Sequence, residues 1–365
     1  MAKNKKSNGE GSISFEADRK MYRARFTDPQ GKRLSQRFKT KKEAKEWLAV
    51  LQADISKNTY VQPNSISLGS WMLDFLQTYK APKVRPKTLE RYMQSAAYLA
   101  PIANMPLQKL TAHNIQQFYN ELPEMSPSSK NKIHKLLKSA VTKACAIDLL
   151  AKNFMLAVEA PPVPKVRVQV FTKEEIHTIL HTIYTDQYYE KYYPFFLLAV
   201  TSGARLGELL GLKTKNIGKG YIFIDNSLQY VKGKLVDMPP KTEAGERRIT
   251  IPSNVESILK AAVRADKVRS FDGYTFHTRN GTPYSPRNME RIWKRVLQLA
   301  GIEHKNFHVL RHTMATQLLA EGVSIAEVAK RLGHSKISHT LNLYSHAIPD
   351  YDKEIPNIIE KIYAI

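Results

Sequence analysis

Six side chains that together could handle a phosphodiester occur in the second half of this 365-residue chain, near the ends of predicted secondary-structure elements. They are Arg205, Lys241, His308, Arg311, His334 and Tyr344. His308 and Arg311 are three residues apart and therefore share one face of a predicted helix. The set poses a chemical question, which is what a tyrosine could do beside two arginines, a lysine and two histidines.

Each of these residues has an ordinary structural explanation when taken alone. Arg205 could cap a helix, His308 could be a core histidine with its hydrogen bonds satisfied, and Lys241 could be one surface lysine among many. As a set they fit phosphodiester chemistry better. Guanidinium groups bind non-bridging phosphate oxygens bidentately, imidazoles add hydrogen bonds, and a lysine can protonate a leaving alkoxide. A tyrosine hydroxyl is then a credible nucleophile.

The order of these residues resembles the catalytic signature of the tyrosine recombinases, the phage and transposon integrase family. TSGARLGELLGL is similar to the first arginine box of that family, FHVLRHTMATQLL to the second, and LGHSKISHTLNLYSH to the nucleophile box. The spacing is similar too, with 23 residues from Arg311 to His334 and 10 from His334 to Tyr344. The motifs are strong between residues 200 and 346.

The resemblance implies a role for each residue. The two arginines would clamp the scissile phosphate and the two histidines would bond its oxygens. Lys241 would be the general acid for the 5′ hydroxyl, and Tyr344 would form a 3′-phosphotyrosyl bond that the free 5′ hydroxyl of a partner strand attacks. This linkage conserves the phosphodiester energy, so the resemblance implies no ATP, metal or other cofactor. Glu208 fits the carboxylate that follows the first arginine, and we interpret it as orienting Arg205 or His308.

Two residues of the motifs leave alternatives open. Lys241 is preferred to Lys232 and Lys234 because PKTEAGERR resembles the lysine turn of the family. His346 completes the YSH ending of the nucleophile box, and the sequence assigns it no role.

The charge of the chain also favours a polyanionic partner. Lys and Arg number 56 against 33 Asp and Glu, a formal net charge of +23. Residues 1–60 carry +8, residues 61–165 carry +7 and the remainder carries +8, so no single basic tail explains the excess. A solvated basic surface is the simpler reading, and a nucleic-acid footprint over several domains is the one that we favour.

Composition excludes several other classes of protein. Cys145 is the only cysteine, which rules out an intramolecular disulfide and a cysteine-based metal site. No apolar run of about 18 residues indicates a membrane span, and the start of the chain lacks a signal-peptide pattern. We therefore expect a cytoplasmic protein, associated with the nucleoid of a bacterial host.

Residues 1–60 are predicted to form an arm-type DNA-binding domain. SISFEA, MYRARFTD and KRLSQRFK read as three strands, followed by a helix whose capping box is Thr40 and Glu43. In the middle strand, aromatic and small residues alternate with Arg23 and Arg25, so the arginines face outward. We predict that both bind DNA; the alternative is that they only keep an exposed face soluble.

Residues 61–160 are predicted to be a helical core-binding domain with a SAM-like bundle. NKIHKLLKSAVTKACAIDLL places its apolar residues on one helical face. Lysines surround that face, and we predict that Lys130, Lys132 and Lys135 contact DNA. Residues 161–169 form a proline-rich linker.

Residues 170–365 are predicted to be the catalytic domain, mainly helical with a small antiparallel sheet and a C-terminal tail helix. The pairs Thr172 with Glu175, Ser253 with Glu256, and Ser324 with Glu327 are predicted capping boxes. Ser285 and Pro286 predict a helix start. The fold class is therefore multidomain α+β.

Two rival functions remain at this point. SIAEVAKRLGHSKISHTLNLY also fits the helix-turn-helix of a non-catalytic DNA-binding regulator. A type IB topoisomerase would share a tyrosine with basic partners, but the amino-terminal basic sheet favours a protein that grips a second class of DNA site. No compact cluster of Asp, Glu or His with metal-ligand spacing indicates a metal-dependent nuclease.

Within the family, the amino-terminal sheet and the length favour the integrase of a phage or conjugative transposon. The resemblance implies core and arm attachment sites in double-stranded DNA and a homotetramer on DNA, with an excisionase and a host DNA-bending protein as possible partners. The stretch IPDYDKEIPNIIEKIYAI carries isoleucines at helical spacing. We expect residues 351–365 to dock on a neighbouring protomer.

Overall fold

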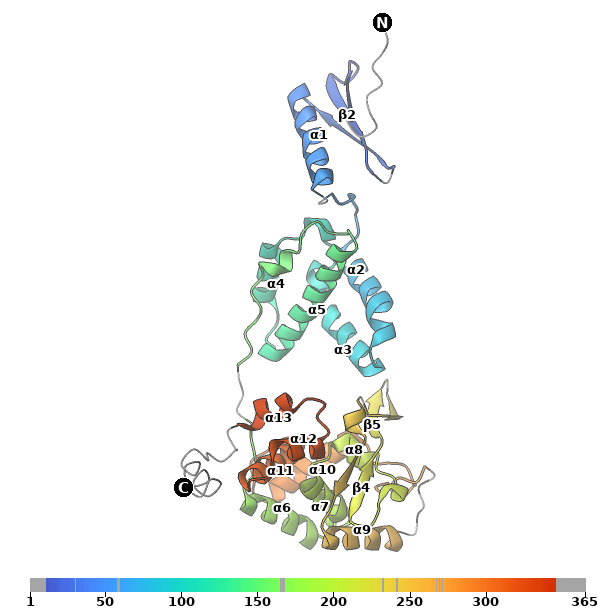
Figure 1. Ribbon diagram of the computed structural model, residues 1–365, viewed down its shortest axis with the longest axis vertical. Helices are drawn as coiled ribbons and strands as arrows, with labels where there is room; N and C mark the ends of the chain where they lie inside the picture. The colour runs from blue at the N-terminus through green and yellow to red at the C-terminus, as the bar shows by residue number, and fades with distance from the viewer. Residues whose placement is uncertain are drawn as a thin grey trace, which may run out of the picture. The chain divides into compact units, whose positions relative to one another are not determined.

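The computed structural model describes residues 11–29, 31–57, 60–164, 168–231, 233–240, 242–266, 268, 270 and 272–345. The chain divides into two compact units, residues 1–164 and 165–365 (Figure 1). Each unit is described by itself. Among the described residues, no helix combines the length and the apolar character needed to cross a membrane.

The first unit begins with a three-stranded antiparallel sheet in the order β1-β2-β3, backed by helix α1. These elements are β1 (Ser12–Glu16), β2 (Met21–Thr27), β3 (Arg33–Phe38) and α1 (Lys41–Ser56). Ala24 and Phe26 of β2 are buried against Ala44 and Leu48 of α1. The predicted capping box of α1 is present. The Thr40 side chain accepts from the backbone N–H of Glu43, and the Glu43 side chain accepts from the backbone N–H of Thr40.

The outer face of this sheet is basic, because strand residues alternate between the two faces. Arg23 and Arg37 stand directly opposite each other in the β2–β3 register. Like charges in that position repel, and Glu16 of β1 lies between them, 3.1 Å from Arg23 Nη1 and 2.7 Å from Arg37 Nε. Arg25, on the same face, is exposed.

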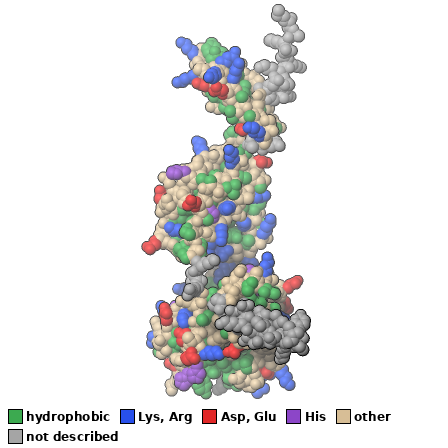
Figure 2. All heavy atoms as spheres, turned by 60° about the vertical axis from the view of Figure 1, so that its left-hand side comes forward, with side chains coloured by type: hydrophobic (Ala, Val, Ile, Leu, Met, Phe, Trp, Pro, Cys, Tyr) green, Lys and Arg blue, Asp and Glu red, His purple; other side chains and the backbone are tan. Residues whose placement is uncertain are grey.

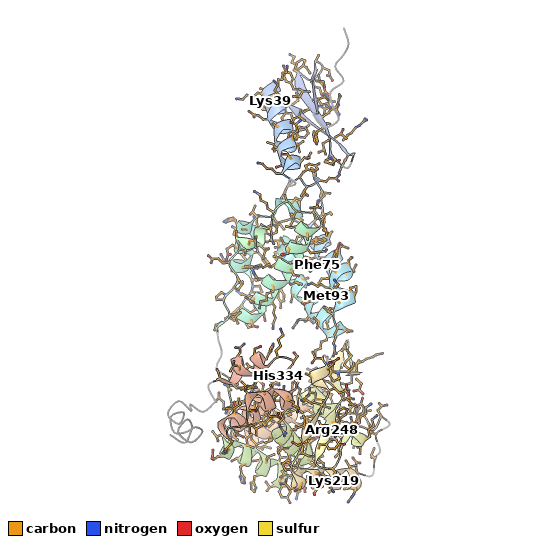
Figure 3. All side chains as sticks on the ribbon, in the orientation of Figure 1. Lys39, Phe75, Met93, Lys219, Arg248 and His334 are labelled. Carbon is orange, nitrogen blue, oxygen red and sulfur yellow. The ribbon has the colours of Figure 1, made fainter. Side chains whose placement is uncertain are left out.

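The rest of the first unit is helical. Its elements are α2 (Leu68–Asp74), η1 (Phe75–Lys80, a π-helical stretch), η2 (Ala81–Lys83), α3 (Pro86–Ala97), η3 (Ala100–Ile102), η4 (Leu107–Lys109), α4 (Ala112–Glu121), α5 (Pro127–Ala146) and η5 (Phe154–Leu156). The predicted apolar face of α5 is buried along its length. Phe75 and Met93 belong to the core that this face completes (Figure 3).

The second unit has a helical core with two small sheets. Its helices are α6 (Lys173–Thr185), η6 (Glu190–Tyr192), α7 (Tyr193–Ser202), α8 (Leu206–Leu210), η7 (Thr214–Asn216), η8 (Glu243–Gly245), α9 (Ser253–Ala265), α10 (Pro286–Leu299), α11 (His308–Ala320), α12 (Ile325–Leu332) and α13 (Ile337–Tyr344). Its strands are β4 (Tyr221–Ile224), β5 (Ser227–Val231), β6 (Lys234–Met238) and β7 (Arg247–Thr250). Helix α7 is apolar on almost every side, as a central helix must be, and it contacts α6, α9 and α11.

The four strands pair as two separate antiparallel ribbons, β4 with β7 and β5 with β6. The β5–β6 hairpin and the turn that follows it thus interrupt the β4–β7 pair in the sequence. The consequence for the site is that β7 returns beside β4 in the core.

Side-chain caps are present at three of the four helix starts predicted in the second unit. Thr172 and Glu175 form a full capping box, and Ser285 caps α10. Only half of the capping box predicted for Ser324 and Glu327 is present: Ser324 accepts from the N–H of Glu327, without the return bond. The predicted capping box of Ser253 and Glu256 was wrong: the N-cap is Pro252, and no side chain caps this helix. Glu256 instead accepts from the N–H of Gly220 at 2.7 Å, because the neighbouring β4 turn offers an unpaired donor.

Candidate active site

Arg311, on α11, is the most deeply buried charged side chain of the site, with 2% of its surface exposed. Its Nη1 donates to the carbonyl of Gly203 at 2.9 Å, and its Nη2 donates to the carbonyl of Leu332 at 2.6 Å and to His334 Nε2 at 3.0 Å. A buried guanidinium needs such partners to offset its lost hydration. Burial nevertheless lowers the pKa of Arg311 to about 9, the nearby charge of Arg205 acting in the same direction.

Two glycines make these carbonyls available. Gly203 ends α7 and Gly333 ends α12, both in the left-handed region with φ of 64° and 68°. This geometry turns the chain away from the helix and favours glycine. A Cβ on Gly333 would also lie 2.8 Å from the carbonyl of Ala244 and 2.9 Å from Arg247 Nη1. The backbone is therefore packed against the site too closely for a side chain at this position.

Arg205 is held at the start of α8 by Glu208. Its Nη1 donates to Glu208 Oε1 at 2.6 Å, and its backbone N–H donates to Oε2 at 2.9 Å. The same carboxylate accepts a hydrogen bond from Nη2 of Arg247, on β7, at 2.9 Å. Burial by itself raises the pKa of Glu208, but Arg247 and then Arg205 outweigh it and lower that pKa to about 2.

Arg247 was missed by the sequence reading. It is 7% exposed and also donates to the carbonyls of Arg331 at 2.7 Å and Gly245 at 3.0 Å. It therefore ties α8, the end of α12 and the turn before β7 together. Its only sequence signal is its place in the stretch GERRI, at the lysine turn. That stretch contains two adjacent arginines, and only the structure shows that Arg247 is buried and Arg248 exposed.

His334 lies in the turn after α12 (Figure 3) and is bonded on both ring nitrogens. Because an arginine can only donate, Nε2 of His334 must accept from Arg311, and Nδ1 then donates to Thr340 Oγ1 at 2.8 Å. Burial and the nearby charges of Arg311 and Arg205 lower the pKa of His334 to about 4, so the ring is neutral at neutral pH. The resemblance assigns His334 a bond to a phosphate oxygen, and in this structure its Nε2 is engaged with Arg311.

Tyr344, the last residue of α13, is fully buried. Its hydroxyl is 2.5 Å from Nδ1 of His312, a residue on α11 that the sequence reading did not select. Burial raises the pKa of Tyr344 to about 12, although the charges of Arg311 and Arg205 act to lower it. His308 lies one helical turn from His312, with the two rings edge to face at 4.8 Å.

The structure brings five of the six predicted residues into one cluster on α8, α11, the α12–α13 turn and α13. These are Arg205, His308, Arg311, His334 and Tyr344, and Glu208 lies beside the first of them. Lys241 and His346 lie outside the described residues, as do Lys232 and residues 351–365. The only sequence signal for His312 is its position directly after Arg311. That position does not indicate a chemical role, because the partner of the histidine is known only from the structure.

The predicted DNA-binding residues lie in the first unit, where basic side chains are spread over both its sheet and its helices (Figure 2). Arg23 is bonded to Glu16 and Ser35, whereas Arg25 is exposed. On α5, Lys132 and Lys135 are exposed and Lys130 is half-buried. Lys132 also lines a groove of about 520 Å³ between α3 and α5, together with Arg91.

Comparison with known proteins places both units among phage integrases. Residues 169–350 match the Phage integrase family, and residues 67–122 match the N-terminal SAM-like domain of phage integrases. The chain is 29% identical to a XerC-like tyrosine recombinase of Caldanaerobacter subterraneus subsp. tengcongensis, covering 92% of this chain and 93% of that protein. It is 25% identical to the ICEBs1 integrase of Bacillus subtilis, covering 88% of this chain and 90% of that protein.

Solved structures show the same fold. The Tn1549 transposon integrase in complex with transposon right end DNA superposes with a TM-score of 0.70 at 20% identity, covering 82% of this chain and 100% of that chain. A lambda integrase tetramer bound to a Holliday junction gives a TM-score of 0.60 at 19% identity, covering 95% and 99%.

The pairing of Glu208 predicts a pH-dependent stability. A carboxylate whose folded pKa is about 2 against an ordinary 4.5 stabilises the fold above pH 4.5, and this contribution is lost as pH falls toward 2. We expect the stability advantage of the wild type over Glu208→Gln to shrink by about 2 kcal/mol between pH 6 and pH 3. Urea unfolding followed by Trp293 fluorescence, with Trp47 and Trp71 replaced by phenylalanine, measures it.

The matched control is Glu321→Gln, which removes an exposed ion pair with Lys173. Because both partners are fully exposed to solvent, the stability difference should be small and nearly independent of pH. A Glu208→Gln difference that does not change with pH would contradict the buried ion pair.

Proposed function

We propose that this chain breaks and rejoins the attachment sites of a phage or transposon through Tyr344. The chain belongs to the phage integrase family of tyrosine site-specific recombinases. The observation that carries the proposal is the position of the Tyr344 hydroxyl. It is bonded to the residue that follows Arg311 and is close enough to Arg311 and Arg205 for both cations to act on its pKa. A buried tyrosine hydroxyl needs one hydrogen-bond partner in any case, but packing alone does not require two arginines near it.

The cluster suits a phosphodiester because it carries positive charge without a compensating anion for every cation. Three arginines converge on it, Arg205, Arg247 and Arg311, and Glu208 is shared by the first two. Arg247 is enclosed, so Arg205, whose side chain is 40% exposed, is the one free to reach a phosphate. Arg311 presents its guanidinium beside it, held in place by two carbonyls and His334.

The proposed reaction has two transesterifications. Tyr344 gives its proton to a base as its oxygen attacks the scissile phosphorus, the P–O5′ bond breaks, and Lys241 gives the leaving oxygen its proton. Arg205 and Arg311 stabilise the added negative charge on the non-bridging oxygens, with a hydrogen bond from His308. The 5′ hydroxyl of another strand then attacks the 3′-phosphotyrosyl bond and returns the tyrosine. Each step exchanges one phosphodiester for another, so neither ATP nor a metal is required.

DNA contact is proposed for both parts of the first unit. The outer face of the N-terminal sheet, with Arg23 and Arg25, would take the arm sites. The exposed lysines of α5 and the groove beside Arg91 would take the core sites. Support comes from charge: residues 1–165 carry +15, and phosphate contacts supply most of the non-specific affinity of such proteins.

Assembly follows from the same proposal. The similar lambda integrase is a tetramer on a Holliday junction, and we propose a homotetramer on DNA for this chain, with the tail of residues 351–365 docked on a neighbouring protomer. An excisionase and a host DNA-bending protein are the accessory partners that such a system would use to set direction.

The first prediction concerns the covalent intermediate. The purified chain, incubated in EDTA with nicked duplexes that join the two ends of the DNA element carrying its coding sequence, should form a protease-sensitive protein–DNA adduct. The nick lets the cleaved end diffuse away and traps the intermediate. Tyr344→Phe should bind the same duplex and give no adduct on a denaturing gel. An adduct in the variant would move the nucleophile to another residue.

A second prediction identifies the general acid. Lys241→Met should slow adduct formation about 100-fold, because a general acid contributes about 10²–10⁴. A duplex with sulfur in place of the bridging 5′ oxygen should restore the rate, since a thiolate leaves without a proton. Lys234→Met is the matched control and should behave as wild type on both duplexes. If Lys234 shows the sulfur rescue instead, the assignment passes to that lysine.

A third prediction separates binding from chemistry. Arg25→Ala and Lys132→Ala should each weaken DNA binding and reduce the slope of log K against log salt by about 1, without changing the adduct rate at saturating protein. Lys173→Ala, which removes a lysine already paired with Glu321, should leave the slope unchanged. Fluorescence anisotropy at several salt concentrations measures it, and unaltered slopes would remove these residues from the DNA interface.

A further inference from the structure

We propose that His312 is the general base that takes the proton of Tyr344 when the tyrosine attacks DNA. This inference rests on the proposed function, because it concerns the nucleophile of that reaction. It starts from one contact: Nδ1 of His312 lies 2.5 Å from the Tyr344 hydroxyl, and the two rings are 5.6 Å apart.

The local structure fixes this contact. His312 follows Arg311 on α11 and so lies in the first turns of the helix that carries the buried cation. Tyr344 ends α13, which packs on α11 and α12. The tyrosine ring is buried among Met314, Ala315 and Leu332, so its hydroxyl has little freedom to leave His312. A short bond between two constrained side chains is the geometry that proton transfer needs.

The tyrosine needs help to ionise in this position. Its pKa is raised to about 12 by burial, in spite of Arg311 and Arg205. At pH 7 only about one such hydroxyl in 10⁵ is a phenolate. A neighbouring base removes this handicap by accepting the proton as the bond to phosphorus forms.

His312 is the histidine of the cluster placed to do this. Both ring nitrogens of His334 are engaged, with Arg311 and with Thr340. Within the described cluster, His308 contacts the ring of His312, whereas the tyrosine hydroxyl is bonded to His312 itself. Burial and the charge of Arg311 lower the pKa of His312, which keeps its ring neutral and its Nδ1 lone pair available.

The proton transfer can be written without any additional reagent. The O–H bond of Tyr344 breaks as its proton moves to Nδ1 of His312, and the tyrosine oxygen forms its bond to phosphorus while the P–O5′ bond breaks. His312 is then an imidazolium with a proton on each nitrogen. In the second transesterification it returns the Nδ1 proton to the departing tyrosine oxygen, so the histidine ends as it began.

In the alternative role, His312 would hold Tyr344 away from the phosphate in the resting protein. This role makes a different prediction. Removal of such a contact would speed cleavage, whereas removal of a base slows it. The hydroxyl is bonded to His312, which directly follows Arg311 on α11, so the tyrosine is held at the helix that carries a phosphate-binding arginine. This observation favours the base.

The test is a single-turnover measurement of adduct formation on the nicked duplex described above. His312→Asn places an amide where Nδ1 was, which keeps a hydrogen bond to the hydroxyl but has no basicity. We expect a rate about 100-fold below wild type, the lower end of the usual contribution of a general base, with unchanged affinity for the duplex. His181→Asn, an exposed histidine on α6, is the matched control and should be fully active.

A second measurement separates chemistry from folding. Difluorotyrosine at position 344 has a more acidic hydroxyl and depends less on a base. In that background the defect of His312→Asn should shrink to about 10-fold or less, a rescue that a structural defect would not show. An undiminished defect, a His312→Asn rate equal to wild type, or a faster rate would each overturn the proposal. An absence of adduct in the wild type would instead overturn the proposed function itself.

Discussion

The burial of the Arg311 guanidinium is the constraint on which the rest of the second unit depends. A charge that is 2% exposed must be offset by oriented dipoles, and the two carbonyls that do this belong to segments 129 residues apart, at Gly203 and Leu332. Both carbonyls are available because a helix ends at each point in the left-handed conformation. The cation thus requires the ends of α7 and α12 to meet at α11. That meeting also brings Arg205, two residues after Gly203, and His334, directly after Gly333, close to the cation.

A second buried charge extends the same arrangement to the sheet. Glu208 is shared between Arg205 and Arg247, and Arg247 continues to the carbonyls of Gly245 and Arg331. One carboxylate among three arginines leaves a local excess of positive charge. Such an excess is costly in the folded protein, and in the proposed function the negative charge of a phosphodiester would offset part of it. Residues that stabilise the fold and residues that would bind the substrate are therefore the same residues, which is common at functional sites.

The helix-turn-helix pattern of residues 324–344 is compatible with two tertiary arrangements, a DNA-reading motif and a packed part of a catalytic site. The two helices and the glycine turn are present, as the sequence predicts. In a groove-reading motif the second helix would face DNA, whereas here Thr340 and Tyr344 of that helix are buried and bonded to His334 and His312. The match to the phage integrase family agrees with this packing. Local sequence decided that there would be two helices, and long-range packing decided what they do.

The sequence by itself determined the strands of the N-terminal sheet, the buried face of α5 and most helix starts, because these depend on side chains within about four positions of one another. The order of the motif residues is itself a property of the sequence. The capping box at Ser253 failed because Glu256 found a donor 36 residues away, at Gly220. Arg247 and His312 were missed for the same reason: each gains its meaning from a partner more than 30 residues distant, Glu208 in one case and Tyr344 in the other. Spacing along the chain can suggest which residues belong to a chemical set, but hydrogen bonds between remote segments exist only after the helices pack, and only the tertiary structure decided which groups hold the arginines and which group touches the nucleophile.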